Sequence, residues 1–125
     1  MKKILIYFSL LFAFWQVQAI NRIVTESHDN TTWNNVLGRP DGNPGTFRWA
    51  IQECNAAGNG PHTITFSSLL NGQTIVLDNW DELLLTVSKV TIDGTGVDVT
   101  ISEDNATGSA LVLQEGANDN IIKGI

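Results

Sequence analysis

Short strand-like segments recur along the chain at a nearly constant interval, and this recurrence limits the possible folds more than any other feature. Ile64, Ile92 and Ile122 each lie in such a segment, and they are separated by 28 and 30 residues. A period of this length, holding about three short strands, is typical of a coiled β-solenoid in which each turn of chain stacks on the turn before. Antiparallel hairpins need no such period.

The residues beyond Pro61 alternate between apolar and polar, and most gaps between the runs contain turn residues such as Asn-Gly or Asp-Gly. Many short strands are also compatible with a sandwich or a barrel, but the period favours the solenoid. The expected strands are His62–Phe66, Thr74–Leu77, Leu83–Val87, Val90–Ile92, Val99–Ser102, Ala110–Leu113 and Ile121–Ile125.

One amphipathic helix is expected ahead of these strands, at about residues 47–57. Its apolar residues are spaced i, i+3, i+4 and i+7 and form a single stripe. They are Phe47, Ala50, Ile51 and Cys54. Thr46 is a suitable N-cap, and Gly58 favours the left-handed conformation that ends helices.

Residues 20–61 form an N-terminal cap region in this interpretation, and residues 62–125 form the first turns of the solenoid. Ile20–Val24 is a candidate edge strand, while Arg39–Gly42 and Asn43–Gly45 are expected to be turns. The helix covers the N-terminal end of the stack. Nothing comparable covers Ile121–Ile125, so we expect a truncated fragment, incomplete at its C-terminus, that can self-associate through this open end.

Residues 1–19 have the pattern of a signal peptide. Lys2 and Lys3 precede an apolar run, and Val17-Gln18-Ala19 supplies a cleavage motif, so we expect cleavage after Ala19. The run is shorter than the roughly 20 residues that cross a bilayer. We therefore expect a secreted protein with no membrane span after cleavage.

The charge of the expected mature chain argues against a nucleic-acid partner. The full chain has seven Lys and Arg against thirteen Asp and Glu, and loss of Lys2 and Lys3 with the leader gives a net charge of −8. Such a chain lacks the basic surface that binds phosphate backbones. Cys54 is the only cysteine, so no intrachain disulfide can form.

Three segments occur in a characteristic order along the chain: Gly45-Thr46-Phe47-Arg48-Trp49-Ala50-Ile51, then His62-Thr63-Ile64-Thr65-Phe66, then Val90-Thr91-Ile92-Asp93-Gly94. This combination resembles the N-terminal region of bacterial secreted and surface proteins with right-handed parallel β-helix (pectate-lyase-like) repeats. In those proteins a Gly-Ser-Leu-Arg-x-Ala-Ile helix is followed by Asp-Thr-Ile-x-Phe and Val-Thr-Ile-Asp-Gly strands.

The resemblance covers about residues 38–125 and implies an all-β fold, a right-handed parallel β-helix with an N-terminal amphipathic cap helix. It implies little about activity. The chain departs from the pattern at Thr46-Phe47, which replaces Ser-Leu, and at Cys54, where Ala is common. It also stops at the third repeated strand, whereas the proteins it resembles have many turns.

Two residues of the expected helix carry reactive groups, and we interpret both as structural. Arg48 lies off the apolar stripe, where it can pair with Asp41 or bond to loop carbonyls. Cys54 lies on the stripe and is expected to be a small buried apolar residue, because no positive neighbour is evident that would lower the pKa of its thiol.

Metal sites are not indicated. His28 and His62 are far apart and have no Cys or carboxylate at ligand spacing. Asp41-Gly42-Asn43 lacks the remaining ligands of a calcium loop and is expected to be a turn.

Paired carboxylates are the strongest candidates for chemistry, because carboxylates on consecutive turns would lie about 4.8 Å apart. The candidates are Asp78, Asp81 and Glu82, with Trp80 able to stack on a sugar, and separately Asp93, Asp98, Glu103 and Asp104. However, Lys123 occupies the position where Asp93 would need a carboxylate partner. We therefore predict no catalytic residue, no cofactor and no metal in this segment.

Asparagines at the expected corners are interpreted as structural. Asn118 and Asn120 precede the last strand and are suited to stacking in a solenoid corner. The sequons Asn30-Thr31-Thr32 and Asn105-Ala106-Thr107 depend on a eukaryotic secretory route, whereas the resemblance is to bacterial proteins.

The sequence therefore predicts a secreted or cell-surface β-helix module with a structural, adhesive or glycan-binding role. Its expected partner is a surface glycan or a protein. The alternative is the non-catalytic N-terminal portion of a polysaccharide lyase or glycoside hydrolase, and whether the whole protein is an enzyme is left open.

Overall fold

The computed structural model describes residues 18–37, 39–77, 82–104 and 108–125. Within these ranges the chain is mostly β-strand, with one α-helix, α1 (Phe47–Ala57), and one 3₁₀ turn at Ser68–Leu70. The prediction of a strand-rich protein with a single helix before the main run of strands is confirmed. None of the helices in these ranges has the length and apolar character needed to cross a membrane.

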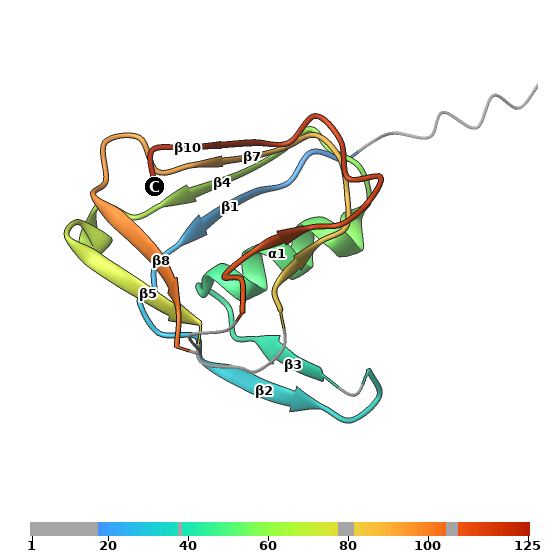
Figure 1. Ribbon diagram of the computed structural model, residues 1–125, viewed down its shortest axis with the longest axis horizontal. Coiled ribbons are helices and arrows are strands. Elements are labelled where there is room, and N and C mark those ends of the chain that lie inside the picture. The colour runs from blue at the N-terminus through green and yellow to red at the C-terminus, as the bar shows by residue number, and fades with distance from the viewer. Residues whose placement is uncertain (1–17, 38, 78–81, 105–107) are drawn as a thin grey trace, which may run out of the picture.

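A four-stranded sheet contains the segments that recur in the sequence (Figure 1). Its strands, in spatial order, are β1 (Asn21–Val24), β4 (His62–Phe66), β7 (Val90–Asp93) and β10 (Ile121–Lys123). All neighbours are parallel.

The register of this sheet aligns the three isoleucines of the sequence period. Ile64 pairs with Ile92, and Ile92 pairs with Ile122, so the predicted column is confirmed. Arg22 pairs with Ile64 and adds a fourth position at the N-terminal end of the column. Parallel pairing without a shift places side chains of the same kind above one another on the same face of the sheet.

Two smaller parallel sheets repeat the same relation. β5 (Gln73–Leu77) pairs with β8 (Val99–Glu103), and β6 (Leu84–Leu85) pairs with β9 (Val112–Leu113). Each strand of one period therefore pairs with its counterpart in the next period. β10 ends two residues earlier than predicted, because Gly124 adopts φ 69° and turns the chain out of the strand.

The core lies between these sheets and α1. Alternate strand residues are buried, as the pattern in β4 shows, where His62, Ile64 and Phe66 are buried and the two threonines are half-buried. The whole predicted apolar stripe of α1 is buried against the strands. Phe47 on α1 packs on Phe66 of β4 with 5.8 Å between ring centroids.

The ends of α1 agree with the capping signals in the sequence. The Thr46 hydroxyl accepts a hydrogen bond from the Trp49 amide at 3.1 Å, which satisfies one of the free donors of the first turn. Gly58, at φ 85°, ends the helix. Because a positive φ disfavours residues with a Cβ atom, glycine is required at this point.

The sequence prediction was wrong for the segment before α1. Arg39–Gly42, expected to be a turn, forms strand β3, which pairs in antiparallel fashion with β2 (Thr31–Asn34). Asp41 and Gly42 therefore lie in a strand, and Pro40 is accommodated because each strand of the ribbon has one edge without a neighbouring strand among the described residues. In Figure 1 this hairpin projects away from the parallel sheets.

Substitutions in the isoleucine column test the stacking directly. Ile92 is 0% exposed and Ile122 is 42% exposed at the same position of neighbouring strands. We expect Ile92→Ala to lower the free energy of unfolding by about 2–5 kcal/mol, because it removes buried methyl groups and leaves a cavity. Ile122→Ala should cost less than about 1 kcal/mol. Chemical denaturation measures both values, and equal losses would contradict the observed register.

Candidate functional site

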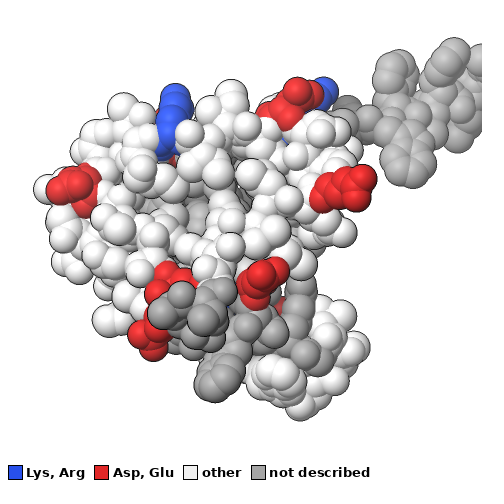
Figure 2. Space-filling model, viewed as in Figure 1, with Lys and Arg blue, Asp and Glu red and all other residues white. Residues whose placement is uncertain are grey.

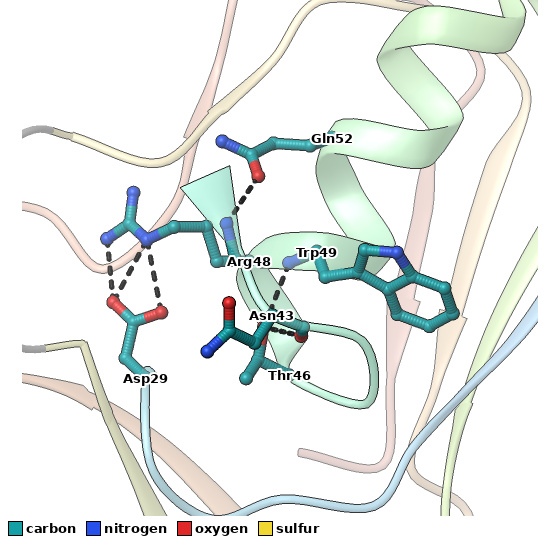
Figure 3. A network of polar contacts seen from close by, with 7 residues as sticks. Asp29, Asn43, Thr46, Arg48, Trp49 and Gln52 are labelled. Carbon is teal, nitrogen blue, oxygen red and sulfur yellow. Dashed lines mark hydrogen bonds and ion pairs between the residues drawn. The ribbon is translucent and has the colours of Figure 1, made fainter. Parts of the chain in front are cut away.

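A buried ion pair joins α1 to the segment before β2 (Figure 3). Arg48 on α1 donates three hydrogen bonds to Asp29, from Nε at 3.1 and 3.0 Å and from a terminal guanidinium nitrogen at 2.8 Å. The two side chains are 3% and 0% exposed. A substrate cannot reach a pair buried to this extent, so its role is to fasten the segment before β2 to the helix.

The predicted partner of Arg48 was wrong. Asp41 forms a hydrogen bond with Asn34 across the β2–β3 hairpin, and Arg48 pairs with Asp29 instead. Asp29 follows β1 in an irregular stretch, and no sequence spacing relates it to a helix that starts eighteen residues later. The structural role predicted for Arg48 agrees with its burial.

The start of α1 is joined to β3 by a second set of polar contacts, also drawn in Figure 3. The Thr46 hydroxyl donates to the Asn43 carbonyl at 2.8 Å, and the Gly42 amide donates to Gln52 Oε1 at 2.8 Å. A Cβ atom on Gly42 would lie 2.3 Å from the Trp49 nitrogen, so the close approach of strand to helix requires glycine there. These contacts fix the cap region to the first turn of the helix.

Asp93, one of the candidate carboxylates of the sequence analysis, is held in an ion pair rather than in a carboxylate pair. Lys123 is its register partner, and the two charged groups are 3.0 Å apart. The Thr95 amide also donates to Asp93 Oδ1 at 2.9 Å. Hydrogen bonds from the Thr95 hydroxyl and amide, and then from Lys123, lower the pKa of Asp93 to about 2. A carboxyl group with this pKa is ionised at neutral pH and is a poor general acid.

The other candidate carboxylates do not form a metal site with the residues that the structure describes. Glu82, Asp98 and Asp104 are exposed, and Glu103 is half-buried at the end of β8. Among described side chains no group of three His, Cys, Asp or Glu residues could hold a metal ion. Asp78, Trp80 and Asp81 lie outside the described residues.

Cys54 is a residue of α1, and its side chain is buried in the core, as predicted. Burial raises the pKa of its thiol to about 11; the positive charge of Arg22 partly opposes this change, and the negative charge of Glu53 adds to it. The thiolate is the nucleophilic form, so this thiol is unsuited to covalent catalysis at neutral pH.

The two histidines are in different environments. His28 is exposed and forms an isolated parallel bridge with Val76. His62 is buried, with both ring nitrogens bonded to backbone groups: Nδ1 to the Ile20 amide at 3.1 Å and Nε2 to the Gly58 carbonyl at 2.6 Å. Neither ring is part of a metal-binding cluster among the described residues.

The corner asparagines have structural contacts, although these differ from a stack of amides. Asn120 accepts from the Val90 amide at 2.8 Å and donates to the Val87 carbonyl at 3.0 Å. Asn118 uses its backbone nitrogen, which donates to the Ser88 hydroxyl at 2.9 Å. Both residues therefore tie the last period to the one before it. Asn30 of the first sequon lies beside β2, and the second sequon lies outside the described residues.

An open groove of about 610 Å³ lies at the corner between the last two periods. Gly94 and Gly124 face each other there, and a Cβ atom on Gly94 would lie 2.4 Å from the Gly124 carbonyl oxygen. This groove was not predicted from the sequence, although Gly94 and Gly124 follow Ile92 and Ile122 at the same spacing. Its lining residues are Asn71, Gly94, Thr95, Gly96, Val97, Asp98, Val99, Thr100, Gly124 and Ile125.

A partly exposed apolar surface lies at the other end of the stack from α1. We call it the open end and define it by the exposed apolar side chains of the last period. They are Leu113, Ile121, Ile122 and Ile125, which are 47%, 53%, 42% and 45% exposed. β10 is at the edge of its sheet, so one side of its backbone has no neighbouring strand among the described residues.

Charged side chains on the face seen in Figure 2 are few and lie apart from one another. Figure 2 shows acidic side chains scattered over one face, with few basic ones among them. On this face neither sign gathers into a patch. The apolar open end is therefore a more distinctive feature than any charged area in that view.

Comparisons with family models, curated proteins and solved structures found no match to this chain.

Removing either partner of the buried ion pair should destabilise the protein strongly. We expect Arg48→Met or Asp29→Leu alone to lower the free energy of unfolding by about 3–5 kcal/mol, because each leaves an uncompensated buried charge. The double variant should recover much of this loss. Glu53→Gln is the control, since it breaks the more exposed pair with Arg22 and should cost at most about 1 kcal/mol. Urea denaturation of the four proteins checks these values.

The pKa of Asp93 can be measured from its carboxyl carbon by NMR as the pH is lowered. We expect a value of about 2, below the ordinary 3.8. Because the folded-state pKa is lowered, the stabilising contribution of this carboxylate is complete above its ordinary pKa and is lost as the pH falls through about 2. Thr95→Val and Lys123→Met should each raise the pKa of Asp93, and an unchanged pKa in Thr95→Val would contradict the assignment of the main cause.

Proposed function

We propose that this chain is a secreted or cell-surface structural module, the first turns of a right-handed parallel β-helix, and that its open end is an assembly surface. The observation that carries the proposal is the contrast within one column. Ile64 and Ile92 are 0% exposed, whereas Ile122 at the next position is 42% exposed. A side chain that is core in two periods is left uncovered in the third.

The parallel pairings support the β-helix part of the proposal. β4, β5 and β6 pair in order with β7, β8 and β9, and every one of these pairings is parallel. Parallel neighbours require a long connection between them, and here each connection runs through the other two strands of the period. A chain that winds in this way gains its stability between periods rather than within one.

The N-terminal sequence supports export. Two lysines, an apolar run and Val17-Gln18-Ala19 precede the first strand, and Gln18 and Ala19 are exposed residues separated from it by Ile20. The resemblance to bacterial surface proteins and the net charge of −8 after cleavage agree with a protein that functions outside the cell. In this role a surface glycan or protein is the proposed partner of the whole protein.

A structural role is favoured over a catalytic one by the environment of the candidate acid. Asp93 is paired with Lys123 at the position where a second carboxylate would be needed. The buried Arg48 and Cys54 are likewise committed to packing or to an ion pair. The alternative, a leading portion of a polysaccharide lyase or hydrolase, places the chemistry on other turns of the protein.

We propose that a second copy of the chain covers the open end when the chain is alone in solution. The N-terminal end is covered by α1, so the apolar columns of two copies can meet through their β10 ends and not head to tail. The negative charge of each copy opposes this contact. Because salt screens that repulsion and leaves apolar burial intact, association should strengthen as ionic strength rises.

Light scattering coupled to size-exclusion chromatography tests the assembly surface. We expect the exported chain to form dimers in a concentration-dependent way, and Ile122→Lys to return it to a folded monomer. Ile23→Lys is the matched control, since Ile23 is 58% exposed on β1 at the opposite edge of the same sheet. This control should leave association unchanged.

Two results would overturn the proposal. One is a monomer that persists at every concentration and melts cooperatively, which would show that the open end needs no cover. The other is cleavage of an acidic polysaccharide by the purified chain in the presence of calcium, because the proposed module has no catalytic role.

A further inference from the structure

The imidazole of His62 binds the chain at the point where the expected leader ends. The ring is buried, and its Nδ1 atom accepts a hydrogen bond from the Ile20 backbone nitrogen at 3.1 Å. On the other side, Nε2 lies 2.6 Å from the Gly58 carbonyl oxygen. The ring therefore connects the start of β1 to the end of α1.

These two partners fix the proton on the ring. A carbonyl oxygen can only accept, so Nε2 must carry the hydrogen. The Ile20 nitrogen donates, so Nδ1 must present its lone pair. The Nδ1 atom of His62 is thus positioned to accept a hydrogen bond from the Ile20 nitrogen, whether that nitrogen belongs to an amide or to an α-amino group.

Among the described residues, Ile20 is the first whose backbone nitrogen and carbonyl oxygen are both hydrogen-bonded to β4. Its nitrogen donates to His62, and its carbonyl accepts from the Thr63 amide at 2.9 Å. Gln18 and Ala19 are exposed and precede the strand. The boundary between exposed chain and bound chain falls between Ala19 and Ile20, which is the bond that the cleavage motif indicates.

We propose that His62 is the binding site for the new α-amino group that processing creates on Ile20. This inference rests on the export part of the proposed function. Hydrolysis of the Ala19–Ile20 peptide bond by a signal peptidase consumes one water, leaves a carboxylate on Ala19 of the released leader, and leaves a protonated amine on Ile20. That amine keeps a donor for Nδ1, and its charge makes the hydrogen bond shorter and stronger than the one from an amide.

The contacts of Ile20 with His62 and Thr63 make the site specific for a chain that begins at Ile20. Cleavage one residue later would remove both the nitrogen that binds His62 and the carbonyl that binds Thr63. Cleavage earlier would leave an amide at Ile20, with exposed residues in front of it and no charged donor. Processing at Ala19–Ile20 is the only cleavage that puts a free amine on the ring.

The first experiment exports the full chain to a bacterial periplasm and measures the mass of the purified product. A product that starts at Ile20 is expected, and a different first residue or an unprocessed chain would overturn the inference. Nitrogen-15 NMR of the ring should show a proton on Nε2 and an unprotonated Nδ1, and the opposite tautomer would contradict the assigned contact.

The second experiment is a double-mutant cycle on the exported chain, with deletion of Ile20 and His62→Phe. Deletion of Ile20 should lower the melting temperature by about 5 °C or more, as expected for loss of buried hydrogen bonds in a domain of this size. In the His62→Phe background the same deletion should have a clearly smaller effect, since the ring contact is already absent. His62→Leu, which also removes the acceptor for the Ile20 nitrogen, serves as the second variant if His62→Phe does not fold.

Equal effects of the deletion in both backgrounds would overturn the His62 site while leaving the export signal and the open end untouched. The export signal is tested separately by the first residue of the product, and the open end is tested by the association state of the product. The cycle thus distinguishes failure of this inference from failure of the proposed function.

Discussion

In-register parallel pairing is the constraint on which the rest of the structure depends. Because Ile64, Ile92 and Ile122 pair without a shift, each period places its inward side chains over those of the period before. A shift of one residue would expose the apolar side chains of the whole strand. Burial is therefore shared between periods, and a single period has no core of its own.

Polar side chains at the corners hold this register where the strands end. The Ser88 amide donates to Asn59, the Asp98 amide donates to Asn71, and the Val90 amide donates to Asn120. In each case an asparagine oxygen of one period satisfies a backbone donor of the neighbouring period. Corners that lack strand pairing would otherwise leave these donors without a protein partner. The abundance of Asn in the sequence thus has a direct structural cause.

The helix and the column of paired isoleucines could be predicted from the sequence because their signals are local or periodic. The helix at Phe47–Ala57 followed from one apolar stripe and two caps, and the column followed from a spacing of 28 and 30 residues. The hairpin of β2 and β3 was missed, because Pro and Gly indicate turns and the pairing of a short ribbon leaves no period.

The candidate site was harder to predict than the fold, since its contacts join residues that no pattern relates. Asp29 lies nineteen positions from Arg48, and Ile20 lies 42 positions from His62. The one contact that the sequence did indicate, Lys123 beside Asp93, follows from the period itself. Contacts that repeat with the period are predictable, whereas those made by the cap region depend on how the irregular chain returns to the helix.

The two ends of the isoleucine column differ in a way that gives the stack a direction. At the N-terminal end the column position belongs to Arg22, which pairs with Glu53 at 2.8 Å and lies over the ring of Trp49 at 5.3 Å. A charge at that position, engaged with the helix, makes the addition of an apolar layer unfavourable. At the other end the same position belongs to Ile122, whose partly exposed side chain gains from being covered. The column thus ends in a charged side chain beside α1 and in a partly exposed apolar side chain on β10.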